Sequence, residues 1–341
     1  MESGNTSFVN SLPGTPYWNN DTLLFKPVFN IMISPVTIVI SVFGIAGNSL
    51  VVWYLSFKIK RTTSSIYIFN LALADAAFLL SLFVMHIFAL FFTLIPHLES
   101  QYEDKHVINL ISTLTLACLF GYNTSLCLLT AISIERCLSV LFPIWYHCNR
   151  PRHMSSIVCT LIWIISCILC VLEFTFCYNI TYNRKGILKE SGKECKITFI
   201  IICSISFAIF IPSMTVSSLI LLLKVRTSSQ YRQHKKLYIV IAVTVLVFLL
   251  FGMPMRVLLL VWYKHHAMPS FPIMDLFSLF SATNSSINPF VYFLVGRQGQ
   301  DGKITLLSIF QAVFRDDWNQ HKREQRKPAE ETVTLPLNFL K

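Results

Sequence analysis

Polar side chains that can bind a cation or share a proton lie inside otherwise apolar stretches of the sequence. Asp75 stands in one stretch, and Asn48, Ser125, Asn284 and Asn288 stand in three others, at similar depths. In a membrane such residues are costly and usually functional. A lone carboxylate there requires a counter-charge or protonation, and a small cation such as Na⁺ is the natural partner. The alternative is a hydrogen-bond network that only joins helices.

A second group of charges lies at the end of an apolar stretch, where Glu135 is followed by Arg136. One interpretation is an ion pair that snorkels at a helix end. The other is a lock that opens to admit a cytosolic partner. Pro212, Pro254 and Pro289 lie inside three of the apolar segments, where each removes a backbone hydrogen bond and can bend a helix.

The elements that must position these residues are membrane-spanning helices. Of the 341 residues, 54% are hydrophobic and only 13% are charged, whereas soluble domains contain about 25% charged residues. A helix needs about 20 residues to cross the hydrocarbon core, and seven apolar stretches are long enough. They cover residues 34–57, 65–94, 107–139, 154–176, 197–224, 237–263 and 271–296. We therefore predict an all-α integral membrane protein, a bundle of seven transmembrane helices.

The basic residues predict an orientation and three regions. Most Lys and Arg fall after spans one, three, five and seven, which favours an extracellular N-terminus. The loop after span four, which carries five basic residues, is the exception. We expect an outer tail over 1–33, the seven-helix domain over 34–296 and a cytoplasmic tail over 297–341. Glycosylation sequons then face outward at Asn5, Asn20 and Asn179.

The cytoplasmic tail contains a candidate for a short amphipathic eighth helix. Residues 305–315 place Leu306, Leu307, Phe310, Val313 and Phe314 at helical spacing, between Lys303 and Arg315. Such a helix would lie on the inner leaflet and contact membrane lipids.

Other functional classes fit poorly. The sequence has no Gly-rich phosphate loop, no His-Glu-x-x-His and no nucleophile elbow, so we expect neither an enzyme nor a cofactor beyond an allosteric ion. The net charge of +11 lies largely in loops and tails beside the membrane and does not indicate nucleic-acid binding. A transporter or channel is the alternative, but no internal repeat is visible. The pair His265-His266 is typical of a solvated loop.

Several motifs together resemble the rhodopsin-like G-protein-coupled receptors. They are Gly47-Asn48, Leu71-Ala-Leu-Ala-Asp75, Glu135-Arg136-Cys137, Trp163 and Asn288-Pro-Phe-Val-Tyr292, in order and one per helix. Longer stretches resemble the Mas-related receptors over nearly the whole chain apart from its termini. They include Phe120-Gly-Tyr-Asn-Thr124, the segment 129–140, Pro143-Ile-Trp-Tyr146 and Gly252-Met-Pro-Met-Arg256.

The resemblance implies a receptor of the plasma membrane that binds an extracellular peptide or small molecule and activates a G protein of the Gq/11 or Gi family. Arg136 would couple to the G protein, helped by Lys235, Lys236 and Tyr292. The layer around Asp75 would act as an ion-binding switch. It also implies a disulfide between Cys177 and Cys195, with two free thiols as the alternative.

The sequence departs from the wider class at two positions that matter for activation and folding. Gly252 stands where most members have a Trp toggle, and no cysteine occurs over residues 104–113 to form the usual disulfide with the second outer loop. Both departures are typical of the Mas-related group.

Charged residues near the outer ends of three spans are candidate ligand contacts. Some Mas-related receptors use a Glu that matches Glu173, together with an Asp, to hold cationic ligands, but the Asp position here is Phe199. Arg256 could bind a ligand carboxylate, since Arg pairs bidentately with carboxylates. The alternative is an internal salt bridge from Arg256 to Glu173 or Asp275. We expect a ligand with an acidic group.

Overall fold

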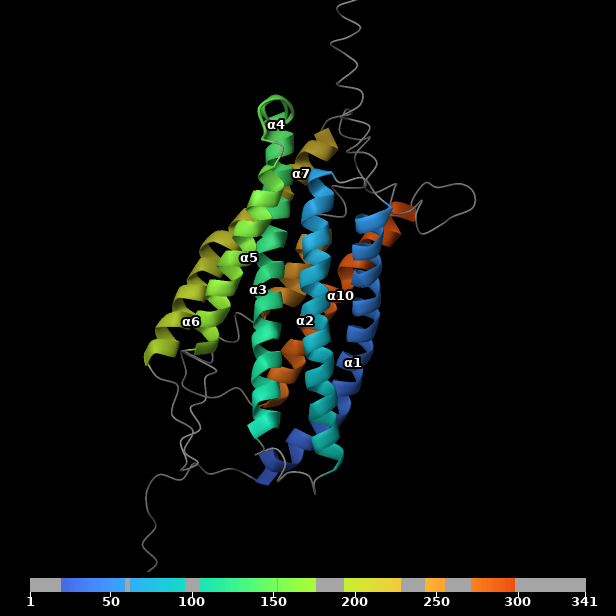
Figure 1. Ribbon diagram of the computed structural model, residues 1–341, viewed down its shortest axis with the longest axis vertical. Helices are drawn as coiled ribbons and strands as arrows, with labels where there is room; N and C mark the ends of the chain where they lie inside the picture. The colour runs from blue at the N-terminus through green and yellow to red at the C-terminus, as the bar shows by residue number, and fades with distance from the viewer. Residues whose placement is uncertain are drawn as a thin grey trace, which may run out of the picture.

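The fold is a bundle of long helices, which run side by side in Figure 1. This computed structural model describes residues 20–58, 62–95, 105–151, 153–175, 193–227, 243–254 and 271–297, and no strand occurs among them. The helices are α1 (Asn20–Phe57), α2 (Thr63–Leu94), α3 (Lys105–Leu141), α4 (Pro143–Cys148), α5 (Met154–Glu173), α6 (Lys193–Ile205), η3 (Ser206–Phe210), α7 (Ile211–Thr227), η5 (Phe248–Gly252) and α10 (Phe271–Arg297).

The observed helices match the predicted spans. Five are long and apolar enough to cross a membrane: Ile31–Phe57, Thr63–Leu94, Lys105–Ser139, Met154–Glu173 and Ile200–Ile220. The sixth predicted span is described only at residues 243–254, where it includes an apolar segment, Val243–Gly252. The seventh is α10, whose 27 residues reach about 40 Å. The apolar stretches therefore predicted the long helices that the structure describes.

The start of one helix and the presence of one short helix differ from the predictions. Helix α1 begins at Asn20 rather than at residue 34, because hydropathy marks the part of a helix that lies in lipid and not the end of the helix itself. Helix α4, which begins with Pro143 in its first turn, was not predicted. The amphipathic eighth helix expected at 305–315 lies outside the described residues.

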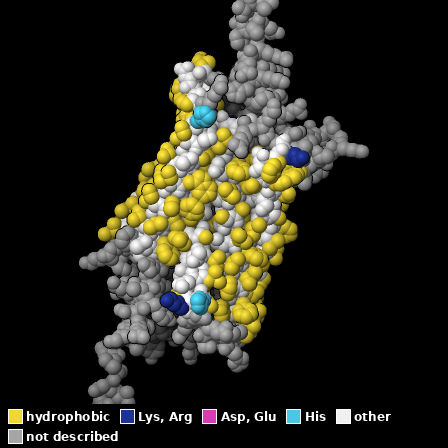
Figure 2. All heavy atoms as spheres, in the orientation of Figure 1, with side chains coloured by type: hydrophobic (Ala, Val, Ile, Leu, Met, Phe, Trp, Pro, Cys, Tyr) yellow, Lys and Arg dark blue, Asp and Glu magenta, His cyan; other side chains and the backbone are white. Residues whose placement is uncertain are grey.

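The helices differ in how much of each is enclosed by the bundle. In α3, 61% of the apolar window is buried, compared with 22% in α5. Large exposed hydrophobic side chains, such as Phe43, Leu80 and Ile168, cover the outward faces of their helices, and Figure 2 shows hydrophobic side chains spread over the visible face. Helix α3 is therefore the central element, and the others present apolar surface to lipid.

Small residues bring α1 close to α2 and α10. Ser34, Thr37 and Ser41 are fully buried, and a Cβ atom at Gly44 would overlap the side chains of Ser286 and Leu79. Small residues are what allow helix backbones to approach closely in membranes. This close contact brings Asn48 of α1 against α10, where the candidate site lies.

Two π-helical turns precede Pro212 and Pro254, two of the three prolines found inside the predicted spans. Turn η3 ends at Phe210, two residues before Pro212, and η5 ends at Gly252, two residues before Pro254. A proline cannot donate the helical hydrogen bond and its ring crowds the preceding turn, which a wider turn relieves. The fifth and sixth predicted spans therefore depart from regular helix geometry where the prolines predicted bending.

Candidate functional site

The carboxylate of Asp75 lies at the centre of the polar layer and joins three helices. Ser125 Oγ on α3 donates to Asp75 Oδ1 over 2.7 Å, and Asn288 Nδ2 on α10 donates to Asp75 Oδ2 over 2.8 Å. All three residues are buried. The structure thus brings together the residues that the sequence placed at one depth.

A fourth helix enters the same layer through Asn48. Its Nδ2 donates to the carbonyl of Ser285 on α10 over 3.1 Å and to that of Gly44 over 3.0 Å. Ser285 also lies beside the Asp75 carboxylate, and the sequence analysis missed this residue. Asn284 is buried on the same helix, so all five predicted members are enclosed in the bundle.

The layer contains oxygen atoms without hydrogen-bond donors. The side-chain carbonyls of Asn48, Asn284 and Asn288 are buried and accept no hydrogen bond. In the part of the chain that the structure describes, no Lys or Arg pairs with Asp75. Leaving buried polar atoms unpaired is costly. The layer therefore has the chemistry of a site for a cation or ordered water: a carboxylate surrounded by neutral oxygen atoms.

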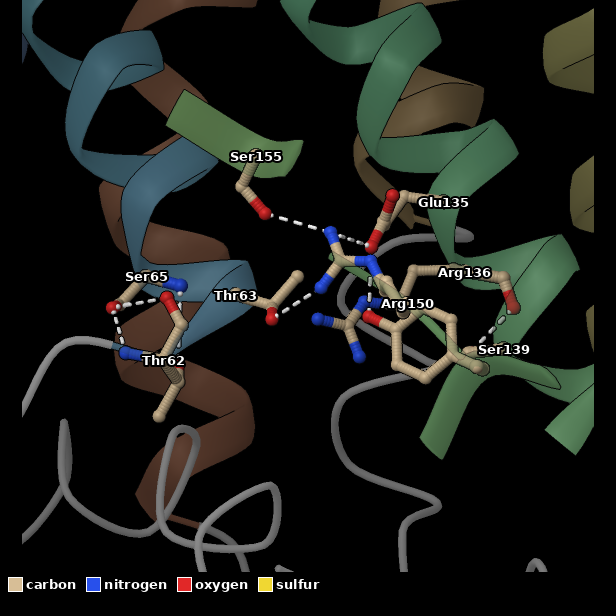
Figure 3. A network of polar contacts seen from close by, with 9 residues as sticks. Thr62, Thr63, Ser65, Glu135, Arg136, Ser139, Arg150 and Ser155 are labelled. Atoms are coloured by element: carbon tan, nitrogen blue, oxygen red, sulfur yellow. Dashed lines mark hydrogen bonds and ion pairs between the residues drawn. The ribbon is translucent and has the colours of Figure 1, made fainter. Parts of the chain in front are cut away.

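A second polar cluster occupies the end of the bundle that carries α4, and Figure 3 shows it in detail. Glu135 Oε1 accepts a hydrogen bond from the Tyr146 hydroxyl over 2.8 Å and forms an ion pair with Arg150 Nη2 over 2.6 Å. Arg150 lies in the short turn between α4 and α5. The contacts found for the Glu135 carboxylate are thus with Tyr146 of α4 and with Arg150 of the turn that follows, whereas the sequence pointed only to the neighbouring Arg136.

Helix α4 supplies the aromatic side of this cluster. The Arg150 guanidinium lies 4.8 Å from the centre of the Tyr146 ring, a cation–π distance. Burial, with a smaller contribution from Glu135, raises the pKa of Tyr146 to about 12. The hydroxyl therefore stays protonated at neutral pH and can donate to Glu135. Tyr146 and Arg150 both belong to the cluster, although the sequence analysis gave neither a role.

The other predicted coupling residues are only partly described. Arg136 is buried beside Glu135, and its carbonyl accepts a hydrogen bond from Ser139. Tyr292 is buried on α10 and lines a cavity of about 20 Å³ with residues of α2, α3 and the sixth span. That space suffices for about one water molecule. Lys235 and Lys236 lie outside the described residues.

The predicted ligand contacts are described on two helices. Glu173, at the end of α5, is 1% exposed and accepts a hydrogen bond from Asn123 Nδ2 of α3 over 3.3 Å. Asp275 is half-buried near the start of α10. Arg256 lies outside the described residues, as do Cys177, the Cys195 side chain, Asn5, Asn179 and the Asn20 side chain. The disulfide and the glycosylation sites remain predictions.

The position that departs from the usual Trp has a distinct contact. The Tyr122 hydroxyl on α3 donates to the carbonyl of Gly252 over 2.9 Å. A Cβ atom at Gly252 would lie 2.7 Å from the ring of Phe248, so a larger side chain would displace that ring. The lack of a side chain at Gly252 therefore leaves room for the Phe248 ring within η5, where the Gly252 carbonyl contacts α3.

A buried histidine also escaped the sequence analysis. His86 Nδ1 of α2 lies 3.2 Å from Ser34 Oγ of α1, and both residues are buried. The signal was present, since His86 is an ionisable residue inside an apolar stretch. The contact joins the halves of α1 and α2 that lie away from α4.

Comparisons with known proteins agree with this geometry. The family of 7-transmembrane receptors (rhodopsin family) matches residues 47–292. The chain is 39% identical to the rat (Rattus norvegicus) Proto-oncogene Mas over 287 residues, 84% of each chain. It is 38% identical to the human (Homo sapiens) Proto-oncogene Mas over 288 residues, again 84% of each. It is 37% identical to the rat Mas-related G-protein coupled receptor member H over 331 residues, 96% of this chain and 94% of the relative.

Proposed function

Since the chain belongs to the seven-transmembrane receptors of the rhodopsin family and, within them, to the Mas-related receptors, we propose that it responds to a ligand with an acidic group and activates a Gq/11 or Gi protein. Membership itself makes it a multi-pass plasma-membrane receptor with a ligand and a G protein as partners, and not an enzyme. The transporter alternative is not favoured.

The observation that carries the switching role is the set of contacts around Asp75. Its carboxylate holds Ser125 of α3 and Asn288 of α10, so a change in its charge or partners alters how three helices pack. A ligand acts on a receptor by favouring one packing over another. Asp75 lies where such a difference can be transmitted through the bundle.

Sodium is the proposed ligand of this layer. The support is chemical: Asp75 has neutral hydrogen-bond partners, and three buried amide oxygens have no donor. Hard cations take oxygen ligands. Asp75 and Ser125 would hold the ion together with oxygens of Asn48, Asn284 and Asn288. The bound ion would supply the positive charge that the surrounding side chains lack.

For orientation, we propose an extracellular N-terminus. Basic residues after spans one, three, five and seven support it. The tail 1–33 and the sequons at Asn5, Asn20 and Asn179 would then face outward. The receptor domain would cover 34–296, and the tail 297–341, with the amphipathic segment 305–315 on the inner leaflet, would face the cytosol.

The acidic-ligand proposal depends on two charged residues of the outer half. Glu173 is buried and already bonded to Asn123, so little of its carboxylate is accessible to a cationic ligand. Arg256 follows Pro254 in the sixth span, and a guanidinium pairs bidentately with a carboxylate. The basic second outer loop would attract an anionic ligand. Asp275 would line the same cavity, and a Cys177–Cys195 disulfide would fix the loop above it.

For coupling, we propose that Arg136 contacts the G protein once the sixth span moves outward. Lys235 and Lys236 at the start of that span and Tyr292 on α10 would complete the surface. The buried position of Arg136 and Tyr292 supports a role that requires an opening of the bundle.

The test is a second-messenger assay in transfected cells, with peptides and small molecules screened separately for calcium and cyclic AMP responses. An acidic agonist whose response requires Arg136 supports the proposal. A receptor activated only by polycationic compounds contradicts the ligand class, and a response that persists in Arg136→Ala contradicts the coupling role.

A further inference from the structure

The guanidinium of Arg150 is held by three helices at the α4 end of the bundle. Besides its ion pair with Glu135 of α3, its Nη1 donates to Thr63 Oγ1 of α2 and its Nη2 to Ser155 Oγ of α5, each over 2.7 Å. The Arg150 side chain is 8% exposed although it comes from a connecting turn. Figure 3 shows the group pointing inward between these helices.

This arrangement fixes where the guanidinium can be. Thr63 lies in the first turn of α2, which a capping box of Thr62 and Ser65 stabilises. Ser155 lies in the first turn of α5 and is 1% exposed. Thr63 and Ser155 lie at helix ends that are themselves fixed. The Arg150 guanidinium is therefore already oriented toward Glu135, and its side chain loses little conformational entropy when the ion pair forms.

Glu135 needs such a partner because its side chain is 6% exposed. A buried carboxylate without a cation is strongly destabilising. Arg136 is the neighbouring cation in the sequence, so the two arginines are alternative counter-charges for a single carboxylate. In the structure, Glu135 Oε1 receives both Arg150 and the Tyr146 hydroxyl. The positive charge beside the buried Glu135 carboxylate is therefore supplied by Arg150, in the turn between α4 and α5.

We infer that Arg150 is the counter-charge that occupies Glu135 and thereby determines how readily Arg136 becomes available to the G protein. Arg150 is a positioning residue, since it acts through Glu135 and need not touch the partner. The inference rests on the proposed role of Arg136 in coupling. It predicts that losing Arg150 strengthens the attraction between Glu135 and Arg136, whereas losing the charges of both Glu135 and Arg150 removes that attraction.

The experiment measures the affinity of the full-length receptor, in lipid nanodiscs, for purified Gq and Gi heterotrimers depleted of nucleotide, without any ligand. The variants are Arg150→Gln, the double variant Glu135→Gln with Arg150→Gln, and Arg136→Ala. Lys58→Gln is the matched control, because Lys58 is exposed and contacts Trp53 rather than the cluster. It removes one basic charge without touching Glu135.

We expect Arg150→Gln to weaken the tighter of the two G-protein complexes about tenfold, and the double variant to restore the wild-type affinity or exceed it. Lys58→Gln should leave the affinity within about twofold of wild type. Unchanged or tighter binding by Arg150→Gln overturns the inference. A double variant no better than Arg150→Gln also overturns it, because Arg150 would then be needed only for folding. Wild-type affinity in Arg136→Ala would instead refute the proposed coupling role.

Discussion

Asp75 and Glu135 are both buried carboxylates, yet the chain surrounds them differently. Asp75 receives a hydroxyl and an amide, which are neutral. Glu135 receives a guanidinium and a phenol, and the guanidinium is itself bonded to two more helices. One carboxylate thus lacks a protein counter-charge within the described chain, and the other has one that is fixed in place.

The difference separates a site that can respond to ions from one that holds the helices together. An uncompensated buried charge favours either a cation or a proton, so its state depends on the solution. A compensated pair depends on the geometry of its partners, and breaking it leaves a buried charge. We therefore expect the packing of the helices to depend on ions at Asp75. At Glu135 we expect it to depend on the positions of the helices and the turn that supply its partners.

The largest effect should come from breaking the compensated pair. Arg150→Met removes the hydrogen bonds that the guanidinium donates to Thr63 and Ser155 together with its ion pair to Glu135, which should lower the free energy of unfolding by about 3 kcal/mol even if Arg136 then pairs with Glu135. Thermal melting of the solubilised full-length receptor measures this. Lys58→Met, at an exposed position, is the control. Equal melting temperatures for the two variants would mean that Glu135 gains nothing from Arg150.

A third buried carboxylate, Glu173, accepts a hydrogen bond from the neutral side chain of Asn123. If Arg256 and not Glu173 meets the ligand, Arg256→Ala should weaken binding of an acidic agonist by about 2 kcal/mol. Competition binding with the agonist found by screening measures the change. An agonist indifferent to Arg256→Ala but abolished by Glu173→Gln would restore a cationic-ligand interpretation.

Asp75→Asn should have a smaller effect, about 1.5 kcal/mol between signalling states, because the amide keeps some hydrogen bonds but removes the charge. Surface labelling should show near-normal expression while the agonist response loses its dependence on sodium. If the wild-type response is the same across a sodium titration, the layer only joins helices.

The smallest effect is expected at a neutral contact between α3 and η5. Tyr122→Phe removes the hydrogen bond to the Gly252 carbonyl and should shift the equilibrium between receptor states by about 1 kcal/mol. Ligand-independent signalling, normalised to surface expression, reports the shift. Phe120→Leu, at a residue that stacks on Trp163 instead, is a control for general loosening of α3. Identical signalling from both variants would assign Tyr122 to packing alone.

The sequence predicted the Asp75 layer well because depth in a membrane can be counted. Each helix rises by a constant amount per residue, so residues at equal depth on neighbouring helices have a strong chance of meeting. Asn48, Asp75, Ser125 and Asn288 were found in this way. Ser285 was missed because a serine in a helix usually bonds to its own backbone and gives no distinct signal.

The cluster at Glu135 could not be predicted in the same way. Arg150 was counted only as a basic residue of a loop, and nothing in its position along the sequence indicates which carboxylate it pairs with. Its partners come from α2, α3 and α5, so the pairing exists only after those helices pack. Helix α4 is six residues long, too short to leave a periodic pattern.

If the Asp75 carboxylate binds sodium, the thermal stability of the purified full-length receptor should differ between sodium chloride and choline chloride at equal ionic strength. An ion that binds the folded state raises its melting temperature by mass action. We predict that sodium stabilises the wild-type receptor and leaves Asp75→Asn unchanged, while Arg150→Met retains the sodium effect. An equal melting temperature of the wild type in both salts would show that sodium does not bind the folded receptor at Asp75.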